Sequence, residues 1–428
     1  MSLTCWLIHA LPSRAIKLKQ VDFLIVGGGV IGLCLALEAK RRYPEQRVMV
    51  LEKESFCGAH ASGRNSGVLH AGFYYAADSL KARFTRDGNR AWRDYCQEHQ
   101  LSVNSCGKLV VAQDEQDLPG LDELWRRAQV NGIEMQPLSA AEARELEPRV
   151  KTYQRALFSP TTAVVDPKQV MRSLTDEVRR CGIDLRLGSG YRAPVAPGSG
   201  ELTILTTTGE TITAGYLINA AGLQADRVAH DFGFAKNLVI LPFKGLYLYS
   251  DEPVGSLRLH VYPVPNLNNP FLGVHYTVTV DGHVKIGPTA IPAFWREHYT
   301  GLQGFNWRES LDILWREAEL WWRNEFDFRR LAWQELSKYR KGHMVSLAER
   351  LVSQVDRRHY RRWGAPGVRA QLLNTSTRKL EMDFCYEGDH RSFHVLNAVS
   401  PGFTCAIPFS RFLFDQIESS QRAIGITR

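Results

Sequence analysis

The hydrophobic pattern near the start of the chain predicts a strand, a helix and a second strand. Residues 21–26 are almost all apolar, as in a strand covered on both faces, and three glycines follow them. Small and apolar residues then recur at helical spacing over 30–42, and Tyr43-Pro44 ends this helix. Residues 47–51 form a second apolar run, which ends at Glu52. This order predicts a βαβ unit with two parallel strands.

Helical and strand patterns alternate along the rest of the chain. Amphipathic spacing predicts helices over 79–99, 121–131, 139–147 and 166–180, with a last helix that ends near residue 420. Apolar runs predict strands over 203–207, 216–220 and 394–399. Residues 241–290 alternate like antiparallel strands, with Asp281-Gly282 as a hairpin turn, and residues 305–360 are helical.

These blocks predict an α/β fold in which a Rossmann-type domain is interleaved with an α+β substrate domain built on an antiparallel sheet. The chain has 428 residues, enough for two hydrophobic cores. An N-terminal extension is expected over 1–20. The Rossmann-type domain is expected to combine 21–98, 160–236 and 361–428, and the substrate domain 99–159 and 237–360.

Composition narrows the classes of partner. The net charge of +8 is compatible with nucleic acid, an anionic membrane surface or an anionic substrate. The basic residues form only short clusters without a nucleic-acid-binding motif, so no nucleic-acid partner is expected. The eight cysteines form no C-x-x-C pair, so no metal site is predicted and the thiols are expected to be reduced. No apolar stretch is long enough to span a membrane, and we expect a cytoplasmic protein, with peripheral attachment to the inner membrane face left open.

A glycine turn follows the first predicted strand with the spacing of a dinucleotide-binding fingerprint. In Gly27-Gly28-Gly29-Val30-Ile31-Gly32, the first glycine permits the turn, Gly29 lets the backbone approach a pyrophosphate, and Gly32 lets the helix pack closely. The helix N-terminus then favours an anion. Glu52 is placed to accept hydrogen bonds from ribose hydroxyls.

Several segments far apart in the sequence indicate that the dinucleotide is FAD. A small-residue loop covers 58–67, and a second small-residue turn follows a late strand at 220–222. An extended cofactor would touch several such segments, whereas an NAD enzyme usually keeps its binding unit contiguous. The predicted FAD contacts are Gly27, Gly29, Val30, Ile31, Gly32, Glu52, Lys53, Ser62, Asn65, Ser66, Gly67, Ala221, Gly222, Ser400 and Gly402.

A series of short motifs resembles one flavoprotein family. They lie in order at 62–72, 74–75, 79–82, 106–109, 165–167, 220–222, 226–227, 262–265, 271–275, 367–371 and 394–401. In combination these motifs resemble the FAD-dependent L-2-hydroxyglutarate dehydrogenases and oxidases of the D-amino-acid-oxidase-like superfamily. The resemblance covers roughly residues 21 to 420 and is poor over 300–345. The chain departs from the family at Arg64, where His is usual, and at Lys244, where Arg is usual.

The resemblance implies oxidation of L-2-hydroxyglutarate to 2-oxoglutarate, by hydride transfer to flavin with a His base. His70 is the first candidate base and His275 the second, because a base needs a pKa near the working pH. The match also favours Lys81 as a catalytic residue. A small carboxylate substrate needs cationic and hydrogen-bonding partners, and the candidates are Tyr74, Lys244, Arg369 and Asn397.

Two alternatives stay open from the sequence. One is an amino-acid or amine oxidase of the same superfamily. The other is a flavin-binding subunit that passes electrons within a complex, for which Trp321, Trp322 and Trp333 could form a partner face. We expect these tryptophans instead to pack in the core or between domains. The sequence does not choose between oxygen and a quinone as electron acceptor, and it does not set the oligomeric state.

Overall fold

The computed structural model describes residues 19–76, 79–195, 201–265, 273–324 and 327–422. Nearly all of the predicted N-terminal extension, and residues 271–272 of one family motif, lie outside the described residues. The predicted βαβ unit is present as β1 (Lys19–Val26), α1 (Val30–Arg42) and β2 (Val48–Leu51), and β1 pairs with β2 in parallel.

The first sheet is built around this unit and follows the order β10-β11-β12-β1-β2-β9. Strand β23 pairs in parallel with the second half of β12, and β22 pairs with β23. The added strands are β9 (Asp184–Arg186), β10 (Tyr191–Pro194), β11 (Leu202–Thr206), β12 (Thr211–Asn219), β22 (Cys385–Gly388) and β23 (Ser392–Asn397). The parallel core β9-β2-β1-β12-β23 is assembled from three distant parts of the chain.

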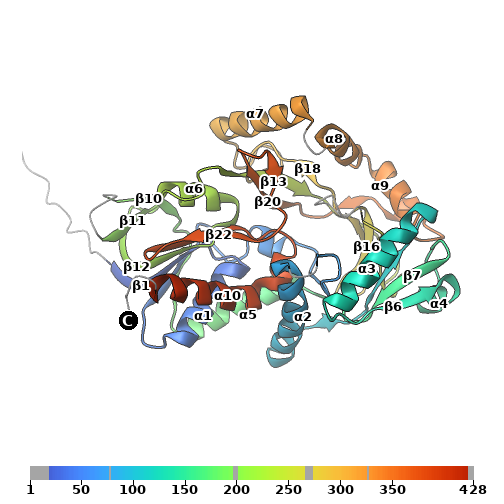
Figure 1. The fold of residues 1–428 in the computed structure, drawn as a ribbon, viewed down its shortest axis with the longest axis horizontal. Helices are drawn as coiled ribbons and strands as arrows, with labels where there is room; N and C mark the ends of the chain where they lie inside the picture. Colours follow the sequence, from blue (N-terminus) through green and yellow to red (C-terminus); the bar gives the residue numbers. More distant parts are fainter. Residues whose placement is uncertain (1–18, 77–78, 196–200, 266–272, 325–326, 423–428) are drawn as a thin grey trace, which may run out of the picture.

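Helices cover one face of this sheet because the strand residues alternate between two cores. Phe23 and Ile25 face a cluster shared with four helices, whereas Leu24 and Val26 face a second cluster. The helices are α1, α2 (Leu80–Glu98), α5 (Pro167–Arg180) and α10 (Gly402–Arg422), and α1, α5 and α10 lie along the sheet in Figure 1. On the opposite side, α6 (Ala225–Asp231) packs near β23.

The second large sheet has the order β19-β14-β17-β16-β15-β5-β7-β6 and is antiparallel except for the parallel pair β15 and β5. Its strands are β5 (Lys108–Val111), β6 (Gln136–Ser139), β7 (Arg155–Ser159), β14 (Leu248–Tyr249), β15 (His260–Pro263), β16 (His275–Val278), β17 (Val284–Gly287) and β19 (Arg362–Trp363). Helices α3 (Leu118–Val130), α4 (Ala140–Leu146) and α9 (Lys341–Ala348) pack on it.

Two smaller sheets join these parts. One has the order β18-β13-β20-β21, with β13 (Leu238–Gly245), β18 (Ile291–Pro292), β20 (Gly367–Asn374) and β21 (Lys379–Leu380). The other joins β3 (Val68–Leu69), β8 (Ala163–Val165) and β4 (Val103–Asn104). Because β19 and β20 pair with strands of the predicted substrate domain, we propose that the last domain boundary lies after β21 and not at residue 360.

Helices α7 (Trp307–Arg323) and α8 (Phe328–Ser337) lie on the outside of the molecule, at the top of Figure 1. The expectation that Trp321, Trp322 and Trp333 are buried is wrong. Their exposed fractions are 43%, 82% and 70%. The helices contact the protein through other residues, such as Ile313 and Leu320 of α7 and Leu331 of α8. The apolar spacing therefore correctly predicted helices there, but not the side on which they are covered.

Candidate active site and cofactor cavity

One continuous cavity lies between the first sheet and the substrate sheets. Its walls come from the glycine turn, the loop 58–70, the turn 220–224, strand β20 and the first turn of α10. Thirteen of the fifteen predicted FAD contacts line it: Gly27, Gly29, Val30, Ile31, Glu52, Lys53, Ser62, Asn65, Ser66, Ala221, Gly222, Ser400 and Gly402. The structure thus brings together segments that are separated by more than three hundred residues in the sequence.

The glycine turn has the tight geometry that the fingerprint requires. Gly27 has φ +113°, and a Cβ there would lie 2.5 Å from the carbonyl oxygen of Ala220. At Gly32 a Cβ would lie 1.9 Å from the carbonyl oxygen of Gly27, so only glycine lets α1 begin this close to the strand. Gly32 therefore supports the turn from behind and does not line the cavity.

The N-terminus of α1 faces the cavity and carries no acidic residue in its first turn. The positive end of the helix dipole is therefore not neutralised locally. Ser62 Oγ accepts a hydrogen bond from the Val30 N–H at 2.9 Å and holds the loop against this end. Glu52 is buried, and its carboxylate accepts hydrogen bonds from the N–H groups of Gly28 at 2.8 Å and Glu54 at 2.9 Å. These bonds hold the Glu52 carboxylate at the cavity wall.

Gly67 also lies outside the cavity wall, where it shapes the loop that carries His70. Its φ is +79°, and a Cβ would lie 2.1 Å from the carbonyl oxygen of Val165. The loop is held on the other side by Thr404, whose hydroxyl accepts a hydrogen bond from the His70 N–H at 3.3 Å. Because Thr404 is in the first turn of α10, His70 lies opposite the N-terminus of that helix at the far end of the cavity.

His70 lines the cavity and is backed by a buried lysine. Its Nδ1 lies 3.4 Å from Nζ of Lys108, and the Lys108 side chain is fully buried. Burial, followed by the charge of Lys108, lowers the pKa of His70 well below its ordinary value. The imidazole is therefore neutral at physiological pH, the form that can accept a proton, but its pKa is not near the working pH, contrary to the expectation for a base.

Lys108 sits in an aromatic cage and forms no ion pair among the residues that the structure describes. Its Nζ lies 4.3 Å from the ring centre of Tyr262, 5.1 Å from that of Tyr74 and 5.5 Å from that of Phe73. Burial lowers the pKa of Lys108 to about 7. The lysine can therefore exchange its proton in the physiological pH range.

Tyr74 and His275 belong to the same buried cluster, but neither lines the cavity. The His275 ring stacks on Tyr262 with ring centres 3.7 Å apart, and its Nδ1 donates to the carbonyl of Gly273 at 2.8 Å. Burial lowers the pKa of His275 well below its ordinary value. The Tyr74 hydroxyl is buried without a hydrogen-bond partner in the described part of the chain. Both residues therefore support the site from behind His70.

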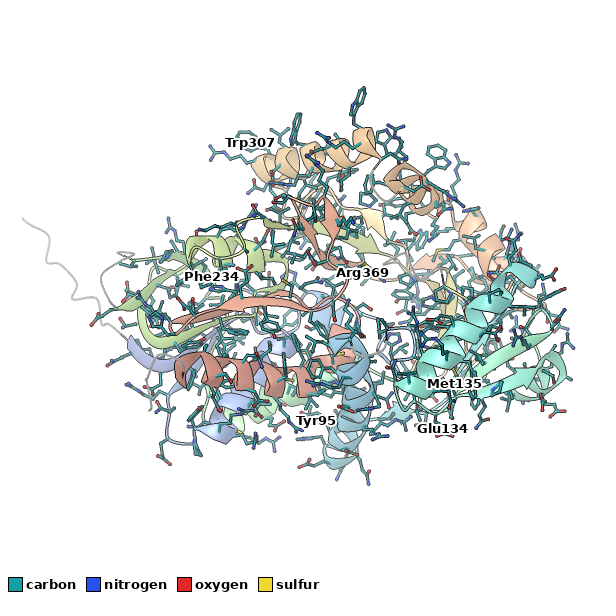
Figure 2. All side chains as sticks on the ribbon, viewed as in Figure 1. Tyr95, Glu134, Met135, Phe234, Trp307 and Arg369 are labelled. Carbon is teal, nitrogen blue, oxygen red and sulfur yellow. The ribbon has the colours of Figure 1, made fainter. Side chains whose placement is uncertain are left out.

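Arg369 lines the cavity from β20 and lies close enough to His70 for its charge to lower the His70 pKa. Figure 2 shows it near the middle of the molecule, where the layers meet. Its neighbour along the sheet is Phe243, directly before Lys244. Arg369 is thus the predicted cation that the structure brings to the same end of the cavity as His70.

Three other predicted site residues lie outside the cavity lining. Burial lowers the pKa of Lys81 to about 8, and its Nζ lies 5.9 Å from the Phe384 ring centre. Lys244 is buried in β13, and burial lowers its pKa. The Asn397 side chain donates to the carbonyls of Glu381 at 3.1 Å and Asp383 at 2.6 Å, which fixes the end of β23.

The residue that sequence reasoning did not select is Lys108. It lies in one of the quoted family motifs, 106–109, but lysine is usually a surface residue, and nothing in the spacing indicated that β5 would bury it beside His70. The available signal was the composition of β5, in which Lys108 begins an otherwise apolar run, Leu109 to Val111. A charged residue in a fully buried strand is a candidate functional group.

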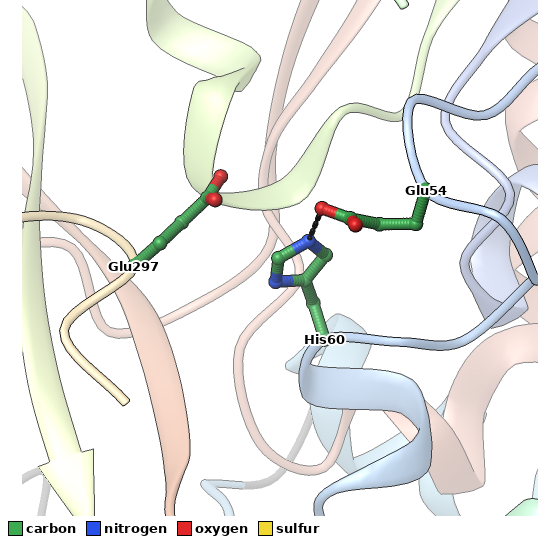
Figure 3. Close-up of side chains that lie close together, drawn as sticks. All are labelled: Glu54, His60 and Glu297. Carbon is green, nitrogen blue, oxygen red and sulfur yellow. Dashed lines mark hydrogen bonds and ion pairs between the residues drawn. The ribbon is translucent and has the colours of Figure 1, made fainter. Parts of the chain in front are cut away.

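At the opposite end of the cavity, Glu54, His60 and Glu297 lie close together (Figure 3). His60 Nε2 lies 2.9 Å from a Glu54 carboxylate oxygen, and its Nδ1 lies 2.7 Å from the Tyr299 hydroxyl. Lys53 forms ion pairs with both carboxylates and supplies the positive charge that a cation would bring. The arrangement is a polar network at the ribose-binding end of the predicted site.

A family model described as FAD dependent oxidoreductase matches residues 22–415 of the chain. The chain belongs to this family of FAD-dependent oxidoreductases. It is 33% identical over 410 residues to the L-2-hydroxyglutarate dehydrogenase of Escherichia coli O17:K52:H18, covering 93% of each protein. It is 31% identical over 426 residues to the mitochondrial L-2-hydroxyglutarate dehydrogenase of Homo sapiens, covering 95% of this chain and 90% of that protein.

Solved structures share the fold of this oxidoreductase. The L-alpha-glycerophosphate oxidase of Mycoplasma pneumoniae with FAD bound superposes with a TM-score of 0.74 at 21% identity, covering 94% of this chain and 95% of that one. The glycine oxidase of Geobacillus kaustophilus has a TM-score of 0.68 at 20% identity, with the same coverage. The Rossmann-type α/β fold with a sheet-based substrate domain is thereby confirmed.

The cofactor of this oxidoreductase family is FAD, and the cavity fits it. The α1 N-terminus offers N–H groups and a positive dipole end to a pyrophosphate, while Glu52 lines the wall where ribose hydroxyls would bind. The first turn of α10 presents a second helix N-terminus at the end that His70 and Arg369 line. Among the described helices none is long and apolar enough to cross a membrane.

Proposed function

We propose that this FAD-dependent oxidoreductase oxidises L-2-hydroxyglutarate to 2-oxoglutarate. The relatives that carry the name L-2-hydroxyglutarate dehydrogenase match it along more than nine tenths of its length. The observation that carries the proposal is the pairing of a neutral histidine, His70, with a guanidinium, Arg369, at one end of the cavity. A 2-hydroxy acid needs a base for its hydroxyl proton and a cation for its carboxylate.

In this reaction, bound FAD supplies the hydride acceptor. His70 removes the hydroxyl proton of the substrate as C2 loses its hydride, so the carbon becomes a ketone and the proton stays on the imidazole. Arg369 binds a substrate carboxylate with its two-pronged donor geometry and thereby orients C2. The buried walls around His70 exclude water and strengthen both interactions.

Lys108 acts as a positioning residue, because its proton decides which ring nitrogen of His70 is free. A charged Lys108 donates to Nδ1 of His70 and leaves the imidazole proton on Nε2. A neutral Lys108 accepts from Nδ1–H and leaves the Nε2 lone pair available as the base. With the pKa of Lys108 lowered to about 7, the active arrangement predominates above that pH.

The test is anaerobic mixing of the FAD-loaded enzyme with a panel of 2-hydroxy acids and 2-amino acids, followed by flavin absorbance. We expect L-2-hydroxyglutarate to bleach the flavin, and D-2-hydroxyglutarate and L-glutamate to leave it oxidised. Bleaching by an amino acid while L-2-hydroxyglutarate has no effect would establish the amino-acid oxidase alternative. If no small acid reduces the flavin unless a second polypeptide is present, the alternative of an electron-transfer subunit is favoured.

The same experiment can be extended to the electron acceptor. Re-oxidising the reduced enzyme with oxygen and with a quinone in turn distinguishes these two acceptors. The cytoplasmic location stays a prediction from the sequence, which leaves attachment to the inner membrane face open and does not set the oligomeric state.

A further inference from the structure

Exposed apolar side chains are concentrated on one part of the surface. Of the 19 large hydrophobic residues that are exposed in the described chain, 12 lie between Phe294 and Tyr339. All five exposed tryptophans are among them. We call the surface of α7 and α8 formed by the following residues the aromatic face: Trp307, Leu311, Leu314, Trp315, Trp321, Trp322, Trp333 and Leu336. Figure 2 shows Trp307 at one end of α7, and side chains of this helix projecting away from the molecule.

Helix α7 turns its apolar stripe outward. Residues 307, 311, 314, 315, 318 and 322 recur at the spacing of one helical face, and all six are exposed. The opposite side, which packs on the protein, includes Glu309 and Ser310 beside Ile313 and Leu320. A helix that only covers a soluble core would present its apolar stripe inward. The outward stripe therefore indicates that this helix contacts an apolar partner outside the protein core.

The aromatic face is also basic. Over 307–341 the charged residues that the structure describes as exposed are six basic ones and two acidic ones, and the Glu319 side chain, which is 40% exposed, adds a third acidic group. The basic residues are Arg308, Arg323, Arg329, Arg330, Arg340 and Lys341, and the acidic ones are Asp312 and Asp327. Asp327 lies within 4.0 Å of Arg330 and Glu319 pairs with Arg323 at 3.2 Å, so the ion pairs reduce but do not cancel the excess of positive charge. Helices that lie at a lipid interface typically combine Trp and Leu with Arg and Lys.

We propose that the aromatic face docks this enzyme on an anionic lipid bilayer, with α7 and α8 lying in the headgroup region. Tryptophan rings prefer that depth, because one edge is apolar and the indole N–H can reach water or a headgroup. The guanidinium groups would pair with anionic headgroups, each contributing on the order of a fivefold increase in affinity. Docking is peripheral, because no described helix can span the membrane.

A second copy of the chain fits this face less well than a bilayer does. In a two-fold dimer the same patch meets itself, so the exposed basic side chains of both copies would be brought into one interface. Like charges across a desolvated interface oppose association. An anionic lipid surface is complementary to the same charges. The charge pattern thus separates two occupants that the tryptophans alone would not.

The experiment is sedimentation of the FAD-loaded full chain with two kinds of vesicle, pure phosphatidylcholine and phosphatidylcholine with one third phosphatidylglycerol. We expect binding to the anionic vesicles that falls at least tenfold without the anionic lipid or at high salt. The triple variant Trp315→Ser, Trp322→Ser, Trp333→Ser should bind at least tenfold more weakly. The double variant Arg308→Gln, Arg330→Gln should lose roughly 25-fold in affinity, on anionic vesicles only.

The matched control replaces three exposed apolar residues elsewhere: Val130→Ser, Leu146→Ser and Tyr153→Ser. It should bind vesicles as the unmodified enzyme does, and both triple variants should reduce a water-soluble dye at the unmodified rate. Failure of the unmodified chain to sediment with anionic vesicles overturns the proposal. So does a dimer, measured by light scattering, that the tryptophan variant converts to a monomer. Neither outcome depends on the substrate of the enzyme.

Discussion

The end of the cavity around His70 and the aromatic face depart from an ordinary soluble protein in opposite ways. Around His70, a lysine and two histidines, Lys108, His260 and His275, are almost completely buried, whereas on the aromatic face tryptophans are up to 82% exposed. Either departure lowers stability unless something compensates it. The compensating partners differ, because a buried cation needs an anion or a proton acceptor and an exposed tryptophan needs an apolar surface. Each region thus indicates what it binds.

The largest effect is expected from the base itself. His70→Ala should keep the fold and FAD, because its side chain forms no part of the glycine turn, but should slow flavin reduction by L-2-hydroxyglutarate about 10²–10⁴-fold. Stopped-flow absorbance under anaerobic conditions measures the rate. The control is His275→Gln, which lies behind the cavity wall and should lose far less. Reduction of His70→Ala at the unmodified rate would remove His70 from the mechanism.

A second prediction compares one residue type in the two kinds of surroundings. Trp92 is fully buried, donates to the Phe403 carbonyl at 2.8 Å and stacks on the Phe403 ring. Trp92→Ala should lower the free energy of unfolding by about 3–5 kcal/mol. Trp322→Ala on the aromatic face should change it by less than about 0.5 kcal/mol. Denaturant unfolding of the FAD-loaded enzyme measures both.

Trp92→Phe provides the same comparison if the alanine variant does not fold, with a smaller loss expected. A large loss of stability in Trp322→Ala would mean that this tryptophan packs within the fold. In that event the aromatic face would no longer be an exposed surface that requires a partner.

Features that depend on local spacing could be predicted from the sequence, whereas features that depend on distant partners could not. The βαβ unit, the glycine turn and Glu52 were predictable because their spacing is local and the backbone geometry depends on a few residues, such as Gly27. The sheet to which β20 belongs was not predictable. Strand β20 pairs with β13, which lies more than a hundred residues earlier, and no local pattern specifies such a partner.

Among the candidate site residues, the position of His70 at the cavity was predictable from the glycine loop that carries it, and that of Arg369 from the family resemblance. The separation of Lys244 and Asn397 from the cavity was not, since side chains of neighbouring residues on a strand point to opposite faces. The exposure of Trp322 was also missed, because helical spacing shows that a stripe exists but not which way it faces.

The smallest effect expected is a change in pH dependence at Lys108. Because the pKa of this lysine is lowered to about 7, it is charged below that pH and holds the His70 proton on Nε2. The second-order rate constant of flavin reduction should therefore rise as pH increases through about 7. Lys108→Met has no titrating group there, so this rise should disappear, and the rate at pH 9 should fall less than about tenfold because Nδ1–H loses its acceptor.

The matched control is Lys285→Met, which removes another buried lysine. Lys285 lies over the Tyr247 and Tyr249 rings and forms no hydrogen bond with His70. Its variant should keep the rise near pH 7, because the Lys108 proton is still present. If Lys108→Met kept the same rise, the titrating group would be another one, such as Lys81, whose pKa burial lowers to about 8. Lys108 would then only fill space in the core, and its pKa would not determine which nitrogen of His70 carries the proton.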